Sequence, residues 1–440
     1  MSSSTKIIRG SFLDFVNDPF YQSEVDSVRY LPDGLLVVEN GKIKAFGTYE
    51  SLKEQYANDE ITSYQDKLIT PGLIDLHVHY PQTEMIAAYG EQLMEWLDQY
   101  TFPTEAKFKD REYARKIASF FLDELLRNGT TTAVVLTTIF PQSVEAIFTE
   151  AQSRQMRIIA GQMLMTRNAP DFLLNDAQTA YAQTREQIQQ WHGLDRLLYA
   201  ITPRFAITST PEELSLAGKL KAEFADVYVH THLAENVQEV QFTAELFPES
   251  KDYLNVYEQF DLIGDRTILA HCVQLDDSAF ARLSDAGAAI AFCPTSNLFL
   301  GSGLFKLDQA KSTQTPIKVG LATDVGGGTS LSQLKTMSDA YKIMQLQNKS
   351  LSVFQAFYLA TLGAAKALSL EDQIGNFELG KEADFVVWDL QATPLMKLRN
   401  PDPKSKNLAE LTEKAFAMMI LGDERAVTAT YVAGEAVQFS

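Results

Sequence analysis

The sequence contains little cysteine, and this shortage narrows the possible chemistry. Only Cys272 and Cys293 occur among the 440 residues, and both lie in apolar stretches. Such thiols are expected to be buried and reduced, which favours the cytoplasm as the location of the protein. Because the two thiols are far apart in the sequence, a cysteine-based zinc site is not expected.

Long hydrophobic runs and positive charge are also scarce. No apolar run reaches the roughly 18 residues that a membrane-spanning helix requires, and residues 1–9 lack the hydrophobic segment of a secretory signal. The chain has 38 basic and 57 acidic residues, which gives a net charge of −19. We therefore expect neither nucleic acid nor an anionic membrane as a partner, because both attract positive charge.

Short apolar stretches separated by helical segments fill the middle of the chain. The stretches are 73–79, 130–138, 157–165, 196–205, 227–232, 266–272, 288–293 and 317–324. Crossovers of this length join parallel strands, and strands that are apolar on both faces are typical of α/β folds. The pattern predicts a (β/α)8 TIM-like barrel. An open doubly wound sheet is the alternative, which the absence of Gly-x-Gly-x-x-Gly after the first strand disfavours.

Both ends of the chain have β-rich patterns. Residues 6–70 contain several short strand signals, with a hairpin signal at Asn40-Gly41, and further strands are expected at 383–389 and 426–437. Neither end can bury enough surface by itself, so we expect one small composite β-sandwich formed by both. The predicted domains are residues 1–70 and 376–440, which build the sandwich, and residues 71–375, which form the catalytic barrel.

Two histidines, His77 and His79, end the first apolar stretch. Residues i and i+2 of a strand point to the same face, so the two imidazoles lie side by side and form half of a divalent-metal site. Other strands also end in polar residues, namely Arg204, His232, His271 and Asp324. The carboxyl ends of barrel strands form the active site, so these side chains should converge. The histidine nitrogens and the aspartate oxygens among them suit Zn²⁺ or Fe²⁺. Such an ion lowers the pKa of a bound water to about 7.

Glu235 is the candidate proton shuttle for that water. It follows His232 by three residues, and can therefore turn back over the strand end. A surface glutamate that opens a helix is the alternative. His230 shares a strand face with His232, so periodicity alone leaves the choice of ligand open. We interpret His232 as the ligand because it is nearer the strand end and Glu235, and His230 and Asp75 as supporting residues.

Several longer stretches carry a likeness to known enzymes. They are 71–79, 79–93, 100–105, 201–205, 230–236, 291–298, 300–305 and 323–330. The His-x-His pair and the aspartate resemble the amidohydrolase superfamily, whereas Tyr80-Pro81-Gln82 and Pro203-Arg204-Phe205 are more specific. Through these stretches the sequence resembles the guanine deaminase family over nearly its whole length.

The resemblance implies one zinc ion per subunit, held by His77, His79, His232 and Asp324, with Fe²⁺ as the alternative. It implies catalytic roles for Glu235, Asp324 and His271, the last of which would orient the water or touch the substrate. Substrate contacts are implied for His79, Tyr80, Pro81, Gln82, Arg204, Phe205, His232, Glu235 and Asp324. Such enzymes are expected to be homodimers.

These implications predict the hydrolytic deamination of guanine to xanthine and ammonia, a step of purine catabolism or salvage. Activated water would attack C2, Glu235 would protonate the adjacent ring nitrogen, and Asp324 would take the proton from the water. Two alternatives remain: a related hydrolase acting on a pterin or triazine, and a non-catalytic scaffold on the same fold. Gln82 and Arg204 argue against the first, and the complete ligand set argues against the second.

Overall fold

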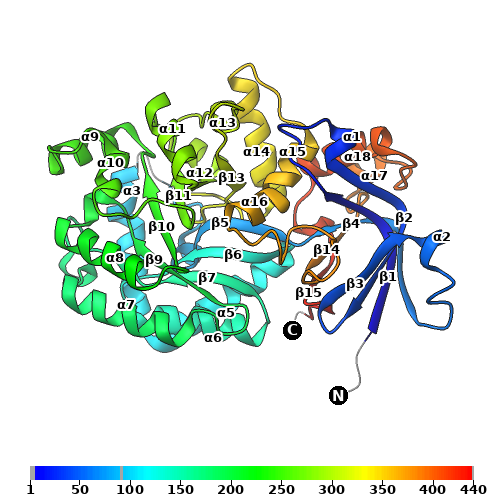
Figure 1. Ribbon diagram of the computed structural model, residues 1–440, viewed down its shortest axis with the longest axis horizontal. Coiled ribbons are helices and arrows are strands. Elements are labelled where there is room, and N and C mark those ends of the chain that lie inside the picture. Colours follow the sequence, from blue (N-terminus) through cyan, green and yellow to red (C-terminus); the bar gives the residue numbers. More distant parts are fainter. Residues whose placement is uncertain (1–4, 90–92, 439–440) are drawn as a thin grey trace. The chain divides into compact units, whose positions relative to one another are not determined.

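The computed structural model describes residues 5–89 and 93–438, and the chain forms two compact units (Figure 1). One unit comprises residues 75–122 and 133–331 and contains most of a parallel barrel. The other comprises residues 1–74, 123–132 and 332–440 and contains a mixed sheet. The domain boundaries expected from the sequence, after residues 70 and 375, stay a prediction.

Among the described residues, eight parallel strands form a nearly closed barrel, which confirms the predicted fold class. Their order is β5-β6-β7-β9-β10-β11-β12-β13, and the two-residue β8 pairs with β9. The strands are β5 (Leu73–His79), β6 (Thr130–Leu136), β7 (Arg157–Gly161), β8 (Met163–Leu164), β9 (Leu198–Pro203), β10 (Tyr228–Leu233), β11 (Thr267–His271), β12 (Ala289–Phe292) and β13 (Lys318–Leu321). Each of the eight predicted stretches contains or overlaps at least one of them.

The barrel closes where the chain after β13 meets β5. The amide of Asp324 donates to the carbonyl of His77 at 2.9 Å, and the amide of His79 donates to the carbonyl of Val325 at 2.8 Å. These two backbone hydrogen bonds form a seam between the first and the last strand of the barrel. The seam lies at the carboxyl ends of the strands, where the predicted site residues also lie.

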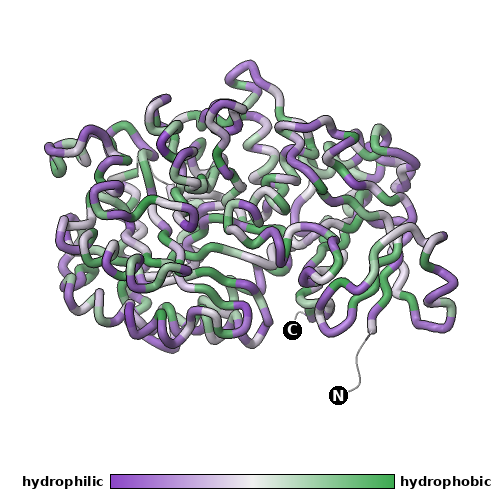
Figure 2. The backbone as a smooth tube through the Cα atoms, viewed as in Figure 1, coloured by the Kyte–Doolittle hydropathy of each residue, from purple (hydrophilic) through white to green (hydrophobic). Residues whose placement is uncertain are grey.

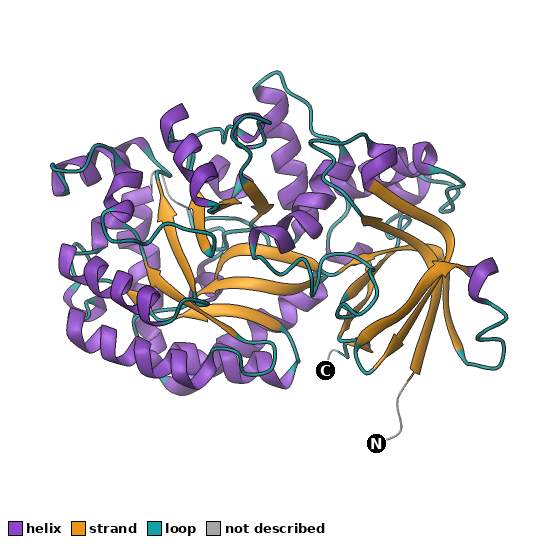
Figure 3. Cartoon of the chain, in the orientation of Figure 1, coloured by secondary structure: helices purple, strands orange, loops and turns teal. Residues whose placement is uncertain are grey.

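Helices alternate with the barrel strands and surround them (Figure 3). They are α5 (Arg111–Arg127), α6 (Pro141–Ser153), α7 (Ala177–Trp191), α8 (Pro211–Glu223), α9 (Val237–Leu246), α10 (Tyr253–Glu258), α11 (Asp277–Ala286), α12 (Pro294–Phe299) and α13 (Leu307–Ala310), with short 3₁₀ turns η4 (Asp171–Leu173) and η5 (Ala206–Thr208). Hydrophobic segments follow the strands, and hydrophilic segments follow the outer helices and loops (Figure 2). The core therefore lies between strands and helices.

One predicted element is wrong. The sequence places Tyr89, Leu93, Trp96 and Tyr100 on one helical stripe and so predicts a single helix over 85–100. The structure instead breaks the chain between residues 80 and 109 into short segments, and residues 90–92 lie outside the described residues. The segments are η1 (Tyr80–Met85), α3 (Leu93–Trp96), the π-helical η2 (Leu97–Thr101), α4 (Phe102–Glu105) and η3 (Ala106–Lys109). Tyr89 is 75% exposed, whereas Leu93 and Trp96 of the same predicted stripe are buried. The helical spacing predicts the wrong structure here because the segment bends around the pocket, which Leu93, Trp96 and Leu97 line.

The second unit contains a seven-stranded mixed sheet in the order β16-β15-β14-β4-β1-β2-β3. Its strands are β1 (Thr5–Phe15), β2 (Val28–Glu39), β3 (Lys42–Thr48), β4 (Ile61–Pro71), β14 (Phe385–Trp388), β15 (Val427–Val432) and β16 (Glu435–Ala436). β4 pairs with β1 on one side and with β14 on the other. Both chain ends therefore contribute strands to one mixed sheet, which confirms that they combine into one β unit. Asn40 and Gly41 form the expected hairpin with φ values of 53° and 76°.

Helices of the second unit are mostly C-terminal. They are α1 (Glu24–Ser27), α2 (Tyr49–Leu52), α14 (Gln333–Leu346), α15 (Val353–Leu359), α16 (Leu362–Ala367), α17 (Pro394–Arg399), α18 (Leu408–Leu421) and the 3₁₀ turn η6 (Glu424–Ala426). In the part of the chain that the structure describes, no helix is long and apolar enough to cross a membrane. Cys272 and Cys293 are both buried and free of disulfides, as expected.

Candidate metal centre and substrate pocket

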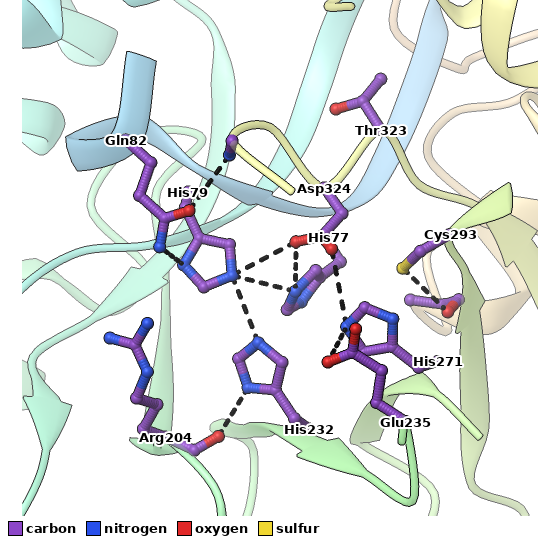
Figure 4. Close-up of polar contacts among 12 residues, drawn as sticks. His77, His79, Gln82, Arg204, His232, Glu235, His271, Cys293, Thr323 and Asp324 are labelled. Atoms are coloured by element: carbon purple, nitrogen blue, oxygen red, sulfur yellow. Dashed lines mark hydrogen bonds and ion pairs between the residues drawn. The ribbon is translucent and has the colours of Figure 1, made fainter. Parts of the chain in front are cut away.

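Four predicted ligands converge at the carboxyl ends of the barrel strands (Figure 4). His77 and His79 come from β5, His232 comes from β10, and Asp324 follows β13. The Nε2 atom of His79 lies 3.2 Å from the Nε2 atoms of both His77 and His232. The Oδ1 atom of Asp324 lies 3.1 Å from His77 Nε2 and 3.3 Å from His79 Nε2. All four side chains are buried.

These distances fit a tetrahedral metal ion. Zinc–nitrogen bonds of about 2.0–2.1 Å place neighbouring ligand atoms roughly 3.3–3.4 Å apart. The measured separations of 3.1–3.3 Å are close to this value. Hydrogen bonding alone does not explain the cluster, because His79 Nε2 has at most one proton and faces two imidazole nitrogens as well as a carboxylate oxygen. The donors present therefore suit Zn²⁺ or Fe²⁺.

The protein holds the second ring nitrogen of two of these histidines, as is usual for metal-binding imidazoles. His232 Nδ1 donates to the carbonyl of Arg204 at 2.6 Å, which leaves its Nε2 free to bind an ion. His77 Nδ1 lies 2.7 Å from His230 Nε2. His230 therefore lies behind a ligand, and His232 lies in the ligand cluster. This placement supports our choice between the two.

Asp75 lies one layer deeper, below the ligands. One of its carboxylate oxygens accepts hydrogen bonds from the amides of His77 at 3.2 Å and of Thr323 at 3.0 Å. The other accepts from the Thr323 hydroxyl. Burial raises the pKa of Asp75 to about 7. The side chain thus ties β5 to the residue before Asp324, which agrees with a supporting role.

His271 and Glu235 stand beside the ligand cluster. His271 Nδ1 lies 2.9 Å from Asn297 Oδ1, and its Nε2 lies 3.6 Å from both Glu235 Oε2 and Asp324 Oδ2. The Ser302 hydroxyl donates to Glu235 Oε1 at 2.9 Å. Burial alone would lower the pKa of His271, but the carboxylates of Glu235 and Asp324 raise it. One oxygen of Glu235 is therefore anchored, and the other faces a protonatable imidazole.

Burial and neighbouring charges shift the other pKa values in directions that suit a metal site. Burial lowers the pKa of His77 to about 4, and it lowers the pKa values of His79 and His232 as well, so that all three imidazoles are neutral. Burial opposes ionisation of Asp324, yet its contacts with His77, His271 and His79 hold its pKa well below the usual value. Burial raises the pKa of Glu235 to about 7, which allows it to exchange a proton near neutral pH.

Backbone strain occurs at the same strand ends. His271 and Asp324 have φ values of 71° and 49°, in the left-handed region that residues other than glycine seldom adopt. Such conformations persist where the surrounding structure fixes them, and they cluster at functional sites. The seam hydrogen bond to His77 helps to hold Asp324 in this conformation.

A pocket with about 380 Å³ of empty space opens beside the cluster. It is lined by His79, Gln82, Leu93, Trp96, Leu97, Arg204, Phe205, His232, Glu235, His271, Leu300, Asp324 and Gly327. A Cβ atom at Gly327 would lie 2.6 Å from Ser296 Oγ, so even an alanine at this position would clash with its surroundings. Apolar walls with a few convergent polar groups suit a small, flat, polar ligand.

Two polar side chains, Gln82 and Arg204, form the side of the pocket away from Glu235. Gln82 Oε1 accepts from the amide of Gly326 at 3.1 Å, and its Nε2 donates to Glu105 Oε1 at 3.0 Å. Arg204 Nη1 donates to both oxygens of Glu105, at 2.9 and 2.8 Å. The ring of Phe205 lies 6.2 Å from that of His232. The guanidinium and amide are thus held at the wall of the pocket.

The structure brings together all but two of the predicted site residues. Tyr80 and Pro81 are buried but do not line the pocket, and the Tyr80 hydroxyl donates to the carbonyl of Ser143 at 2.7 Å. Their predicted contact with substrate stays a prediction, which the pocket does not support. Sequence reasoning assigned no role to Glu105 or Ser302, because neither ends a strand, although both lie in stretches that carry the family resemblance.

Comparison with known proteins agrees with this site. The amidohydrolase family matches residues 68–437. The guanine deaminase of Escherichia coli K12 is 51% identical over 434 residues, which cover 98% of this chain and 97% of that protein. The chain belongs to the guanine deaminase family. This membership confirms the resemblance found in the sequence.

Solved structures are similar as well. The E. coli guanine deaminase structure covers 99% of both chains with 48% identity and a TM-score of 0.93. A guanine deaminase from C. acetobutylicum, which has guanine bound in its active site, is 28% identical with a TM-score of 0.88 and covers 99% of this chain and 100% of that chain. A zinc-bound adenosine deaminase from Xanthomonas campestris shares the fold at 23% identity, a TM-score of 0.83 and coverage of 98% and 92%.

Proposed function

We propose that the protein catalyses the hydrolytic deamination of guanine to xanthine and ammonia. One observation carries this proposal: a buried cluster of metal-type donors opens into a pocket whose opposite wall presents the amide of Gln82 and the guanidinium of Arg204. These groups can bind the polar edge of a purine, and Phe205 offers an aromatic face. Guanine deaminases from E. coli and C. acetobutylicum support the choice of substrate, because this chain belongs to their family.

We infer that one zinc ion per chain occupies the cluster, bound by His77, His79, His232 and Asp324. The ligand separations and the neutral imidazoles support this assignment, and Fe²⁺ suits the same donors. When bound, the ion would lower the pKa of a water molecule and supply a nucleophile at neutral pH. The zinc in the adenosine deaminase of the same fold agrees with this choice.

The side chains then divide the proton transfers among them. Water adds to C2 of guanine, and Asp324 accepts a proton from it while His271 orients it. Glu235 protonates the ring nitrogen next to C2, takes up the proton of the new C2 hydroxyl and passes it to the amine. The C2–N bond then breaks, ammonia leaves and C2 keeps a carbonyl oxygen. The raised pKa of Glu235 lets it hold this proton, and Ser302 fixes the direction of the carboxylate.

We further propose a cytoplasmic homodimer. The two buried free cysteines support a reducing compartment. The family resemblance is the only basis for the dimer. Light scattering on the purified enzyme tests it, and the molar mass of a monomer would contradict it.

The proposed reaction is tested with purified protein and a panel of bases. Guanine should be converted to equal amounts of xanthine and ammonia, and a chelator should abolish this turnover until zinc is restored. Adenine, cytosine, pterins and a triazine are assayed as alternative substrates. Turnover of a pterin or triazine without turnover of guanine would favour the related hydrolase, and a fully active metal-free enzyme would refute the metal assignment.

A further inference from the structure

The polar wall of the pocket depends on a residue behind it, Glu105. This glutamate is fully buried at the end of α4 and does not line the pocket. Its carboxylate contacts Gln82 from η1 and Arg204 from the end of β9. One carboxylate therefore joins the two side chains that the proposed function assigns to base recognition.

Glu105 occupies only one corner of the guanidinium of Arg204. Both hydrogen bonds between the two side chains use Nη1, which also contacts the sulfur of Met163 at 3.1 Å. The guanidinium carbon lies 5.6 Å from the ring centre of Phe102, which is on the same short helix as Glu105. These contacts hold the guanidinium at one nitrogen and leave Nη2 and Nε as its remaining donors for a ligand.

Glu105 also fixes the orientation of the Gln82 side-chain amide. Gln82 Nε2 is 3.1 Å from Nδ1 of His79, and a metal-bound His79 would carry its proton on that nitrogen. Both atoms would then be donors, so this contact favours the opposite orientation of the amide. The carboxylate of Glu105 accepts from Nε2, and the amide of Gly326 donates to Oε1. These two contacts hold the orientation against His79.

Glu105 also supplies the negative charge that balances the buried cation of Arg204. Arg204 is 3% exposed, and a buried cation without a counter-charge is strongly unfavourable. In the part of the chain that the structure describes, Glu105 is the ion-pair partner of Arg204. Its removal would leave a positive charge free to move toward water or toward another acceptor.

We propose that Glu105 is a positioning residue for base recognition, which acts through Arg204 and Gln82 without touching the substrate. The proposal rests on the proposed function, because these two side chains matter here as groups that bind guanine. It predicts that loss of the carboxylate weakens binding of the base more than it slows the chemical step.

The first test is the zinc-loaded Glu105→Gln variant, assayed with guanine beside the wild type. KM should rise roughly 10- to 100-fold, and kcat should fall by a smaller factor, with unchanged zinc content. Glu150→Gln is the matched control, because Glu150 also pairs with arginines, Arg115 and Arg154, but lies away from the pocket. An unchanged KM in Glu105→Gln would overturn the proposal.

A double-mutant cycle separates positioning from a general loss of stability. In an Arg204→Met background, Glu105→Gln should change KM far less than it does in the wild type, because its main route of action is already gone. Independent effects, in which the two increases in KM multiply, would overturn the coupling through Arg204.

Folding and function are controlled separately. If Glu105→Gln does not fold, Glu105→Asp keeps the charge but shortens its reach, and it should also raise KM; an unchanged KM in this variant would overturn the proposal. A wild-type enzyme that does not convert guanine would refute the proposed function instead. An active wild type with an unchanged KM in the variants refutes only the role of Glu105.

Discussion

The pocket has two halves that are built differently. The metal half consists of His77, His79, His232 and Asp324, which stand at strand ends of the barrel. The recognition half consists of Gln82, Arg204 and Phe205, with Glu105 behind them; Gln82 lies on η1 and Glu105 on α4. Backbone pairing between strands places the metal half, whereas side-chain hydrogen bonds place the recognition half.

This difference implies a division of labour. Strand geometry fixes the position of the metal ligands to within a narrow range, so the chemistry depends on the barrel itself. The recognition half can change through a few side chains while the barrel stays the same. Substitutions in the metal half should therefore abolish turnover, whereas those in the recognition half should change affinity and selectivity.

The largest effect is expected from loss of a ligand. His77→Ala removes one of four donors and should lower both zinc content and turnover of guanine, the latter by at least roughly 1,000-fold. Metal analysis and a guanine assay on the same sample check this. Full activity with full zinc content would break the comparison, because the metal half would then tolerate change.

Glu235→Gln should have the next largest effect. The variant keeps the shape of the side chain but removes its exchangeable proton, so kcat should fall roughly 100- to 10,000-fold. Zinc content should stay at the wild-type level, because Glu235 is not among the clustered donors. Undiminished kcat in a zinc-loaded sample would contradict the role of Glu235.

Arg204→Lys should have a smaller effect, of a different kind. Lysine keeps the charge but lacks the planar fork that contacts Glu105 through one nitrogen and offers others to a base. KM for guanine should rise by roughly 10-fold, equivalent to about 1.4 kcal/mol, while zinc content stays constant. A fall in kcat as large as that expected for Glu235→Gln would contradict the division between a metal half and a recognition half.

The smallest effect on turnover is expected from Glu213→Gln, which lies outside both halves and serves as a reference for the other variants. Burial raises the pKa of Glu213 on α8 from 4.5 to about 7 in the folded protein. The protonated form therefore favours folding, and this contribution is complete below about pH 4.5 and is lost as the pH rises through about 7. The Tm of the wild type relative to Glu213→Gln should fall from pH 5 to pH 8, with guanine turnover equal in both proteins. A constant difference in Tm would show that this carboxyl does not titrate.

The two halves also differed in how far the sequence could predict them. The i, i+2 spacing of His77 and His79 and the strand-end positions of His232 and Asp324 follow from strand geometry, so the metal half was visible in the sequence. Arg204 is also a strand-end residue, but its role in binding the base, like that of Gln82, was predicted through family resemblance. Glu105 was missed because its partners are brought to it by tertiary packing, and no local spacing records that.

The predicted helix over 85–100 failed for a related reason. Aromatic residues at helical spacing indicated one amphipathic helix, but the chain there breaks into short segments that bring Leu93, Trp96 and Leu97 to the pocket. Packing against the pocket overrides local preference in such short pieces. By contrast, all eight barrel stretches were found, because continuous burial on both faces leaves a strong apolar signal.

The barrel seam has a consequence for how the protein assembles. His77 and His79 stand on one side of the seam and Asp324 on the other, and Asp75 and Thr323 link the same two segments across 248 positions of sequence. A bound ion would cross-link the two ends of this long loop, because its ligands come from the first barrel strand and from the chain after the last. We expect contacts between such distant segments to form late, since closing the loop carries an entropic penalty. Metal uptake should therefore mark the end of folding, and a chain whose barrel has not closed would have no site to fill.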